Sequence, residues 1–284
     1  MSSARYFSNE QQINPYYHDE PVDLDKALFE HDHLRVTMEL AGIAVRQVAA
    51  PSDSQDGVYT ANWALIRGRT AVLARLPAAR KAEEDWAERQ LRAFDLDVQR
   101  VPEGWRFSGQ GDALPAGKYL FAGQGYRSDP EAQRFAADTL GYELVQLQTV
   151  PQLDETGAPV INQESGWPDS FYYDLDLSMA IIKIPTEGQN GLIAYCPEAF
   201  TAESVTKLLD LSDDFDFIVV SEQEARGAFA CNLVSTGETV IMSAHAPHLK
   251  SDLHAHGLKT LTPHIEELAK GGGFIRCQTL TFND

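Results

Sequence analysis

At 284 residues and 43% hydrophobic content, the chain can bury a large core, so a fully disordered protein is excluded. Its formal net charge of -19 is spread along the whole sequence, which argues against a nucleic-acid or anionic-membrane partner and is compatible with a cationic or small zwitterionic ligand. The first 20 residues are polar and no run of about 18 apolar residues occurs, so neither export nor membrane spanning is expected.

The cysteines favour a reducing compartment. There are three, an odd number without close spacing, which gives neither a disulfide framework nor a zinc pattern. They are Cys196, Cys231 and Cys277. We therefore expect a cytoplasmic protein.

Short strand-like runs and helical periods alternate along the chain. Apolar spacing predicts a helix over 22–42, followed by units in which two strands precede a helix and a further strand. In chain order, the expected elements of these units are strands 58–66 and 70–76 with helix 78–94; strands 105–114 and 118–124 with helix 130–141 and strand 143–150; strands 171–184 and 191–196 with helix 202–210 and strand 215–220; and strands 229–235 and 239–244 with helix 248–256 and strand 258–261.

This order of elements recurs every 55–70 residues or so, roughly the period of a repeat architecture, although residue identities do not repeat. One domain covering 1–284 is expected. Residues 151–170 carry Pro and Gly signals with little periodicity, and we expect a surface loop that covers the site.

The segment 271–280 presents one cysteine after three consecutive glycines. Glycines allow backbone angles closed to other residues and let a ligand approach closely. The alternating side chains that follow are typical of a strand, which would present Cys277 as a nucleophilic thiol. A C-terminal strand with a buried cysteine is the alternative that residue type alone favours.

Several separated motifs occur in one order over nearly the whole chain: Asn14-Pro15, Val58 to Leu65, Phe107-Ser108-Gly109-Gln110-Gly111-Asp112, Gly125 to Ser128, Tyr173-Asp174-Leu175-Asp176, Ala230 to Val234 and Gly271 to Cys277. Together they resemble the guanidino-group-modifying superfamily of dimethylarginine dimethylaminohydrolases, arginine deiminases and amidinotransferases. The resemblance implies an α/β fold, a five-bladed pentein-type propeller of ββαβ units around a polar channel. It also implies a small guanidino or amidine substrate, no cofactor and no metal, and it allows a homo-oligomer.

The resemblance also implies roles for individual residues. Cys277 matches the family's nucleophile, a thiolate that attacks the amidinium carbon of an arginine-like substrate and forms a thiouronium intermediate. Asp112 and Asp176 match carboxylates that face the guanidinium. Arg127 matches a position near the substrate's carboxylate end, where a guanidinium fork fits a carboxylate. A surface arginine paired with Asp129 is the alternative for Arg127.

Two catalytic positions depart from the family pattern. Asp174 stands where the family has its catalytic histidine, and Ser108 stands where it has a glutamate. Asn62 replaces the aspartate of deiminases, although this form occurs in hydrolase-like relatives. We expect Asp174 to take part in catalysis beside Cys277, and Asn62 to bind substrate. Clustered carboxylates share protons, so a raised pKa of one of them would supply the acid that the histidine normally provides.

Two functions follow from these residues. The leading hypothesis is a thiol-dependent hydrolase or deiminase that cleaves a C–N bond of an arginine-like compound through Cys277. The alternative is a catalytically reduced member that binds a cationic guanidino metabolite. Alternatives for His245 are a substitute acid or, with His248, a metal ligand; the sequence favours surface or capping roles for both, and no metal is expected.

Overall fold

The structure is a computed structural model that describes residues 1–17 and 19–282. Within these residues the chain forms four three-stranded sheets, each an antiparallel hairpin joined through a helix to a parallel third strand. The first sheet contains β1 (Ala64–Arg67), β2 (Thr70–Leu73) and β3 (Asp97–Arg100), with α2 (Ala82–Ala93) before β3. The second contains β4 (Ala113–Ala116), β5 (Tyr119–Gln124) and β6 (Glu143–Gln148), with α3 (Pro130–Leu140).

The other two sheets repeat this order. The third contains β7 (Met179–Lys183), β8 (Gly191–Tyr195) and β9 (Phe215–Val219), with α4 (Ala202–Leu209). The fourth contains β10 (Val234–Ser235), β11 (Thr239–Ile241) and β12 (Lys259–Leu261), with α6 (Pro247–Ala255). Two helices lie outside this pattern, α1 (Leu24–Leu40) and α5 (Glu222–Ala228).

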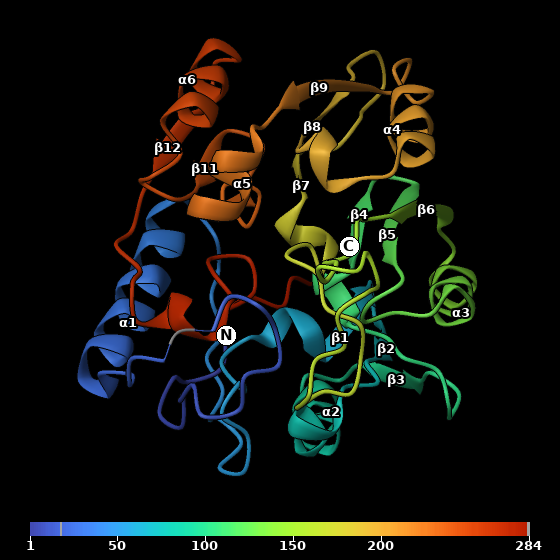
Figure 1. The fold of residues 1–284 in the computed structure, drawn as a ribbon. Coiled ribbons are helices and arrows are strands. Elements are labelled where there is room, and N and C mark those ends of the chain that lie inside the picture. The colour runs from blue at the N-terminus through green and yellow to red at the C-terminus, as the bar shows by residue number, and fades with distance from the viewer. Residues whose placement is uncertain (18, 283–284) are drawn as a thin grey trace.

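The four sheets lie around a common centre, and α1 occupies the remaining sector of the ring (Figure 1). In that sector the chain forms an isolated parallel bridge between Ser2 and Val48 instead of a sheet. The predicted α/β class and the repeated ββαβ order are confirmed. Four sheets and a fifth sector are compatible with the expected five-bladed propeller.

Local sequence accounts for these elements. The middle strand β8 is buried along its whole length, as expected for a strand with neighbours on both sides. Helix α3 begins with Pro130 in its first turn and ends at Gly141, whose φ of 71° is the left-handed conformation of a helix C-cap. Side-chain caps start three other helices: Thr201 accepts from the Ser204 N–H at α4, Asp23 from the Lys26 N–H at α1, and Ser221 from the Glu224 N–H at α5.

Several predicted strands are shorter than the sequence pattern indicated. The sequence pattern extends the predicted strands over 58–63, 105–112 and 171–178. In the structure, the segments just before β1, β4 and β7 are instead short 3₁₀ helices, at Thr60–Trp63, Gly109–Gly111 and Leu175–Leu177. Strand β3 and helix α5 were not predicted. Both are short, with four and seven residues, and contain few large apolar side chains.

The prediction of a C-terminal strand over 271–280 is wrong, because this segment forms turns after a 3₁₀ helix at Leu268–Gly271. Its backbone bonds to two different loops: the carbonyl of Cys277 accepts the Ala61 N–H at 3.0 Å, and the Arg276 N–H donates to the Asn232 carbonyl at 3.4 Å. A strand needs one continuous partner, and here the partners come from the first and fourth units.

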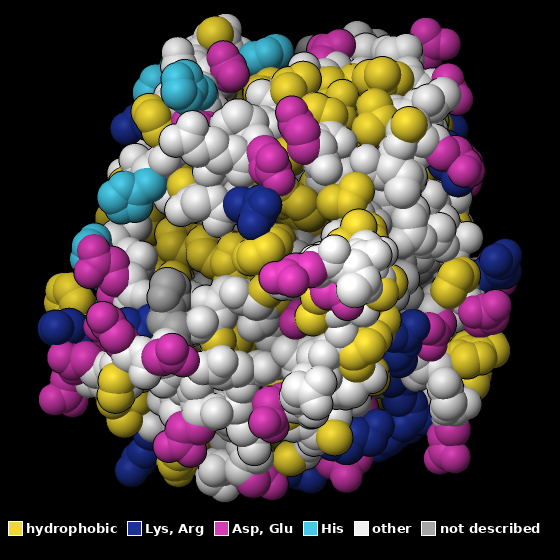
Figure 2. Space-filling view, viewed as in Figure 1, with side chains coloured by type: hydrophobic (Ala, Val, Ile, Leu, Met, Phe, Trp, Pro, Cys, Tyr) yellow, Lys and Arg dark blue, Asp and Glu magenta, His cyan; other side chains and the backbone are white. Residues whose placement is uncertain are grey.

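On the face shown in Figure 2, acidic side chains are spread over the surface, and hydrophobic side chains gather near its middle. No helix among the described residues is long and apolar enough to cross a membrane. Residues 151–170 form the expected irregular segment, with two isolated bridges, Leu153 to Pro159 and Ile161 to Pro168. Asn162 in this segment donates to the carbonyl of Gln12 at 3.0 Å, which ties it to the N-terminal loop.

Candidate active site

A polar residue stands just before the first strand of each sheet. Asn62 lies in the short helix before β1, Asp112 ends the one before β4, and Asp176 lies in the one before β7. Asn232 occupies the matching place two residues before β10. All four side chains are buried. The repeat therefore supplies one polar group from each unit to the centre of the ring.

The side chain of Asn62 joins the positions at which the sequence departs from the family pattern. Its Nδ2 donates to Asp174 Oδ2 at 2.7 Å and to Ser108 Oγ at 2.8 Å. The backbone comes close because residue 111 is glycine, and a Cβ there would collide with both Asn62 Nδ2 and Asp174 Oδ2. The second oxygen of Asp174, Oδ1, is buried and accepts no hydrogen bond within the described chain. That oxygen is free to accept a donor from a ligand.

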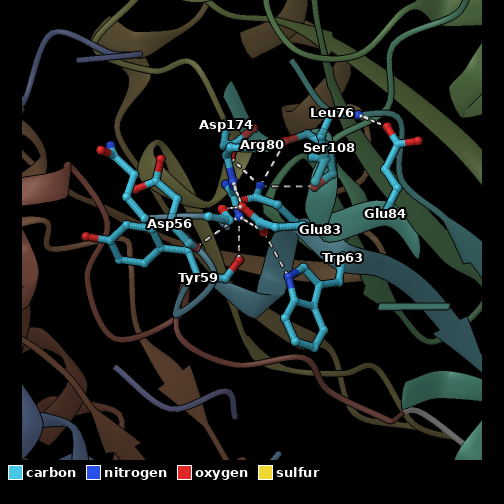
Figure 3. Close-up of polar contacts among 12 residues, drawn as sticks. Asp56, Tyr59, Trp63, Leu76, Arg80, Glu83, Glu84, Ser108 and Asp174 are labelled. Carbon is cyan, nitrogen blue, oxygen red and sulfur yellow. Dashed lines mark hydrogen bonds and ion pairs between the residues drawn. The ribbon is translucent and has the colours of Figure 1, made fainter. Parts of the chain in front are cut away.

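The buried ion pair between Arg80 and Glu83 (Figure 3) fixes the orientation of the Asn62 amide. Arg80 donates through Nη1 to Asn62 Oδ1 at 2.7 Å, and its Nε and Nη2 bind Glu83 Oε1 and Oε2 at 2.8 and 2.7 Å. Glu83 also accepts from Trp63 Nε1 at 2.9 Å and Ser54 Oγ at 2.6 Å. With its oxygen held by a guanidinium, Asn62 must direct its NH₂ group toward Asp174.

Cys277 is held on a turn between Asn232 and Asp176. Asn232 Nδ2 donates to Cys277 Sγ at 3.1 Å, and Asn232 Oδ1 accepts the Cys277 backbone N–H at 3.2 Å. Sγ lies 3.6 Å from Asp176 Oδ2. The thiol is 3% exposed. One neutral donor and one carboxylate therefore contact the sulfur directly.

The electrostatics favour protonated groups while no cation is bound. Burial, and then the charge of Asp176, raise the pKa of the Cys277 thiol well above its usual value. Burial and the charge of Asp174 likewise raise the pKa values of Asp112 and Asp176. The hydrogen bonds that the three aspartates accept come from neutral donors, including Leu175 N to Asp112 at 3.1 Å. A bound cation would offset the charge repulsion within this group.

A small cavity of about 10 Å³ lies beside Cys277, which is room for about one water molecule. Asn62, Arg127, Tyr173 and Asn14 contribute to its wall. Arg127 is buried, donates to the carbonyl of Ile13 at 2.7 Å and stacks on the Tyr173 ring at 4.2 Å. The surface alternative for Arg127 is therefore wrong.

The N-terminal loop closes this cavity by docking on the glycine run. Asn14 Nδ2 donates to the Gly271 carbonyl at 3.1 Å, and Gly272 has a φ of 81°, a conformation that favours glycine. A Cβ at Gly272 would collide with Asn14. The glycines were expected to admit a ligand, and in this structure they admit a loop of the same chain.

The six residues predicted for the site come together. Cys277, Asn62 and Arg127 line one cavity, Asp176 contacts Cys277 and Asp174 contacts Asn62. Asp112 lies close enough to Asp174 for the charge of Asp174 to raise the pKa of Asp112. Their catalytic and substrate-binding roles stay predictions.

Other sequence interpretations have clear outcomes. Asp129, proposed as the partner of Arg127, binds Arg106 instead, at 2.6 Å. His245 and His248 are exposed, and His248 Nδ1 lies 3.0 Å from Glu224 Oε1 on α5, away from Cys277. No group of three or more His, Cys, Asp or Glu side chains with metal-binding geometry occurs among residues 1–17 and 19–282.

Sequence reasoning missed three functional neighbours: Arg80, Glu83 and Asn232. Asn232 lies in the motif Ala230 to Val234, and its place before the first strand of the fourth unit matches that of Asn62 in the first. That equivalence was a usable signal. Arg80 and Glu83 lie on an ordinary charged helical stretch, where three-residue spacing is typical of a surface pair.

No family model matches the chain. A dimethylarginine dimethylaminohydrolase of Mycobacterium tuberculosis is 31% identical over 283 residues, which cover 99% of this chain and 84% of that protein. The chain belongs to this family of guanidino-group-modifying enzymes. The bifunctional arginine dihydrolase/ornithine cyclodeaminase ArgZ of Synechocystis is 29% identical over 228 residues, but the match covers only 29% of that longer protein.

Solved structures of family members have the same fold. The N-terminal domain of ArgZ, with a cysteine replaced by serine and substrate bound, superposes with a TM-score of 0.84 at 26% identity and covers 100% of this chain and 97% of that domain. A dimethylarginine dimethylaminohydrolase adduct with S-methyl-L-thiocitrulline has a TM-score of 0.71 at 19% identity, covers 97% of this chain and 96% of that protein, and supports the fold alone.

Proposed function

We propose that this protein is a thiol-dependent hydrolase or deiminase that cleaves a C–N bond of an arginine-like guanidine or amidine compound. The observation that carries this proposal is the group of three buried carboxylates, Asp112, Asp174 and Asp176, of which Asp176 contacts the Cys277 thiol. Their hydrogen-bond donors within the described chain are neutral, so a bound cation would be the first to contact these carboxylates directly. A planar guanidinium supplies both the charge and the N–H donors.

Family membership supports the same reaction. The ArgZ domain has been crystallised with its substrate, its product and a covalently bound reaction intermediate. In this chain, the cysteine beside a carboxylate and an amide donor has the groups that a covalent intermediate requires.

The reaction proceeds in two steps. When the guanidinium binds, the thiol proton moves to Asp176, the sulfur bonds to the amidinium carbon, and the C–N bond breaks as the leaving amine takes a proton from a carboxyl of the site. Water then attacks the thiouronium carbon and loses two protons, one to the sulfur as the C–S bond breaks and one to the site carboxylate that protonated the leaving amine, which releases the ureido product. Asp176 is suited to carry the proton because it lies 3.6 Å from Sγ and its pKa is raised by burial and by Asp174.

Asp174 and Arg127 orient the substrate in this proposal. Asp174 Oδ1 accepts a guanidinium N–H, while Oδ2 stays bound to Asn62. Arg127, on the wall of the small cavity, binds the substrate's carboxylate. Because the cavity beside Cys277 has room for about one water molecule, the loop that contains Ile13 and Asn14 must move before substrate enters.

A specific observation favours a second function, a member that binds a cationic metabolite without turnover. The family's histidine position holds Asp174, which is engaged with Asn62, and the thiol pKa is raised by burial and Asp176. Losing a positioned acid or base costs on the order of 10²–10⁴-fold in rate.

The test measures released amine, ammonia and ureido product by mass spectrometry for arginine, methylated arginines and related amidines. The enzyme proposal expects turnover that Cys277→Ser abolishes and that Cys196→Ser, a change at another buried cysteine, retains. Thermal stabilisation by these compounds that persists in Cys277→Ala, with no product from the wild type, would instead establish the binding protein.

A further inference from the structure

A second, much larger cavity of about 980 Å³ lies behind the segment that bears the thiol. Consecutive residues face the two cavities: Arg276 lines the large one and Cys277 the small one. Strands from the second, third and fourth units contribute to its wall, together with the C-terminal segment 279–282 and residues 43–46 after α1. The large cavity therefore lies on the other side of this segment from the small one.

The charge of this cavity is the reverse of that of the chain. Among its described lining residues, four are basic, Arg46, Arg69, Lys183 and Arg276, and two are acidic, Asp95 and Asp176. The whole chain has 23 basic and 42 acidic residues. A cavity with more basic than acidic side chains attracts anions. It repels cations such as the guanidinium compounds proposed to bind at Cys277.

Arg276 is the cation best placed to hold an anion. Its Nη1 donates to Thr279 Oγ1 at 3.0 Å and to Thr281 Oγ1 at 3.2 Å, and its Nη2 donates to Gln110 Oε1 at 3.0 Å. Within the described chain its hydrogen bonds all go to neutral oxygens. Burial lowers its pKa, so its charge is only partly compensated.

The rest of the wall is mainly apolar, with side chains from α1, β4, β7, β10 and the C-terminal segment, such as Met38, Leu114, Met179, Val234 and Leu280. The volume lies within the usual range of roughly 300–1,000 Å³ for small-molecule sites, whose walls combine apolar area with a few polar anchors. We propose that this cavity binds a small organic acid with an apolar body, whose carboxylate contacts Arg276 and whose body contacts the apolar wall.

Such a ligand would also reach the thiol electrostatically. Arg276 and Cys277 are neighbours in the chain, and the positive charge of Arg276 and the negative charge of a Cys277 thiolate stabilise each other. A carboxylate on Arg276 offsets that charge, so occupation of the large cavity slows alkylation of Cys277. The cavity is thus an inhibitory site for an acid that differs in charge from the substrate.

The binding test uses octanoate as the probe, with octylammonium and octanol as matched controls of the same chain length, in calorimetric titrations of the whole protein. Octanoate should bind saturably at one site per chain, and octylammonium should not. Arg276→Gln should weaken octanoate binding at least about tenfold, since a lost charge-assisted hydrogen bond is worth about 1.5–3 kcal/mol. Lys207→Gln, a change at an exposed side chain of α4, should leave octanoate binding unchanged.

Arg276→Gln also removes contacts that hold the C-terminal segment. A second variant, Lys183→Gln combined with Arg69→Gln, therefore removes two other basic side chains that line the large cavity, and it too should weaken octanoate binding. Absence of octanoate binding to the wild type overturns the proposal. So does octanol binding as tight as octanoate binding, or binding that neither folded variant weakens. Saturating octanoate should reduce the rate of Cys277 alkylation by iodoacetamide, and an unchanged rate overturns the inhibitory role. These readouts do not require turnover, so their failure is distinct from failure of the proposed reaction.

Discussion

Asn232 contacts Cys277 with both ends of its side-chain amide: Nδ2 donates to Sγ at 3.1 Å, and Oδ1 accepts the backbone N–H of the same residue at 3.2 Å. The two bonds fix the rotation of the turn that carries the thiol. An N–H donor also stabilises a thiolate, which opposes the effect of burial on the Cys277 pKa. We therefore expect Asn232 to act as a positioning residue for the proposed nucleophile, Cys277.

Replacing Asn232 by alanine should slow alkylation of Cys277 at pH 8 by about ten- to a hundredfold, because a hydrogen bond to a charged group is worth about 1.5–3 kcal/mol. The pH at which alkylation is half-maximal should move upward. Intact mass measured over time with iodoacetamide gives both quantities. Asn190→Ala, at an exposed amide that contacts Asp216, is the matched control. An unchanged pH profile in Asn232→Ala would show that the contact with sulfur has no electrostatic effect.

Asp176→Asn should affect reactivity and turnover in opposite directions. Removing the carboxylate next to Sγ removes the charge that, after burial, raises the Cys277 pKa, so the alkylation profile should shift to lower pH and the rate at pH 7 should rise. Turnover should fall by about 10²–10⁴-fold, since the proton carrier is lost. Asp216→Asn, at an exposed position on β9, serves as the control. A variant in which both rates fall would argue that Asp176 supports the fold and not the proton transfer.

The sequence predicted the repeat because each unit buries a hydrophobic hairpin and an amphipathic helix, and both patterns are local. It overextended the strands at 58–63, 105–112 and 171–178, where apolar residues such as Trp63 and Leu175 are buried in short 3₁₀ helices instead. Apolar alternation reports burial, and these turns are buried because they meet at the centre of the ring.

The sequence predicted those site residues that lie in recognisable motifs. It did not predict contacts between residues that only the fold brings together. Asp174 and Cys277 are 103 residues apart in the sequence. They lie in the same site because Asp174 directly precedes the 3₁₀ helix before β7 and Cys277 lies in the C-terminal turns that pack beside that helix. The contact of Arg80 with Asn62, in contrast, depends on a buried ion pair whose sequence spacing is that of any exposed helical pair. Burial, which distinguishes the two cases, is a property of the whole fold.

Arg80→Gln should lower the free energy of unfolding by about 3–5 kcal/mol, because it leaves the buried Glu83 carboxylate without its cation. The same change frees Asn62 Oδ1, so the amide loses the contact that orients it toward Asp174. Urea denaturation followed by circular dichroism measures the loss. Lys207→Gln, which breaks an exposed pair with Glu203, should change stability by less than about 1 kcal/mol. Equal effects of the two variants would mean that the buried pair contributes no more than a surface pair.

Two buried groups near the N-terminal segment should give pH dependences of opposite sign. Burial raises the pKa of Asp56 to about 6 and lowers the pKa of His31 to about 4. The folded state therefore holds the Asp56 proton more tightly than the unfolded chain, and this contribution to stability is full below about pH 4 and is lost as pH rises through 6. His31 binds its proton less tightly when folded, so its contribution is present near neutral pH and is lost as pH falls from about 6.5 to 4.

The difference between each variant and the wild type isolates these contributions from the many other acids. The unfolding free energy of Asp56→Asn minus that of the wild type should rise between pH 4 and pH 7 by about 2–3 kcal/mol, at about 1.4 kcal/mol per pKa unit. For His31→Gln, the corresponding difference should fall over the same interval. Urea denaturation at half-unit steps of pH gives both curves, and Asp216→Asn, at an exposed carboxylate, should give a nearly flat one. If the two difference curves had the same sign, at least one of these groups would be solvated in the folded protein, and its burial would not set its ionisation.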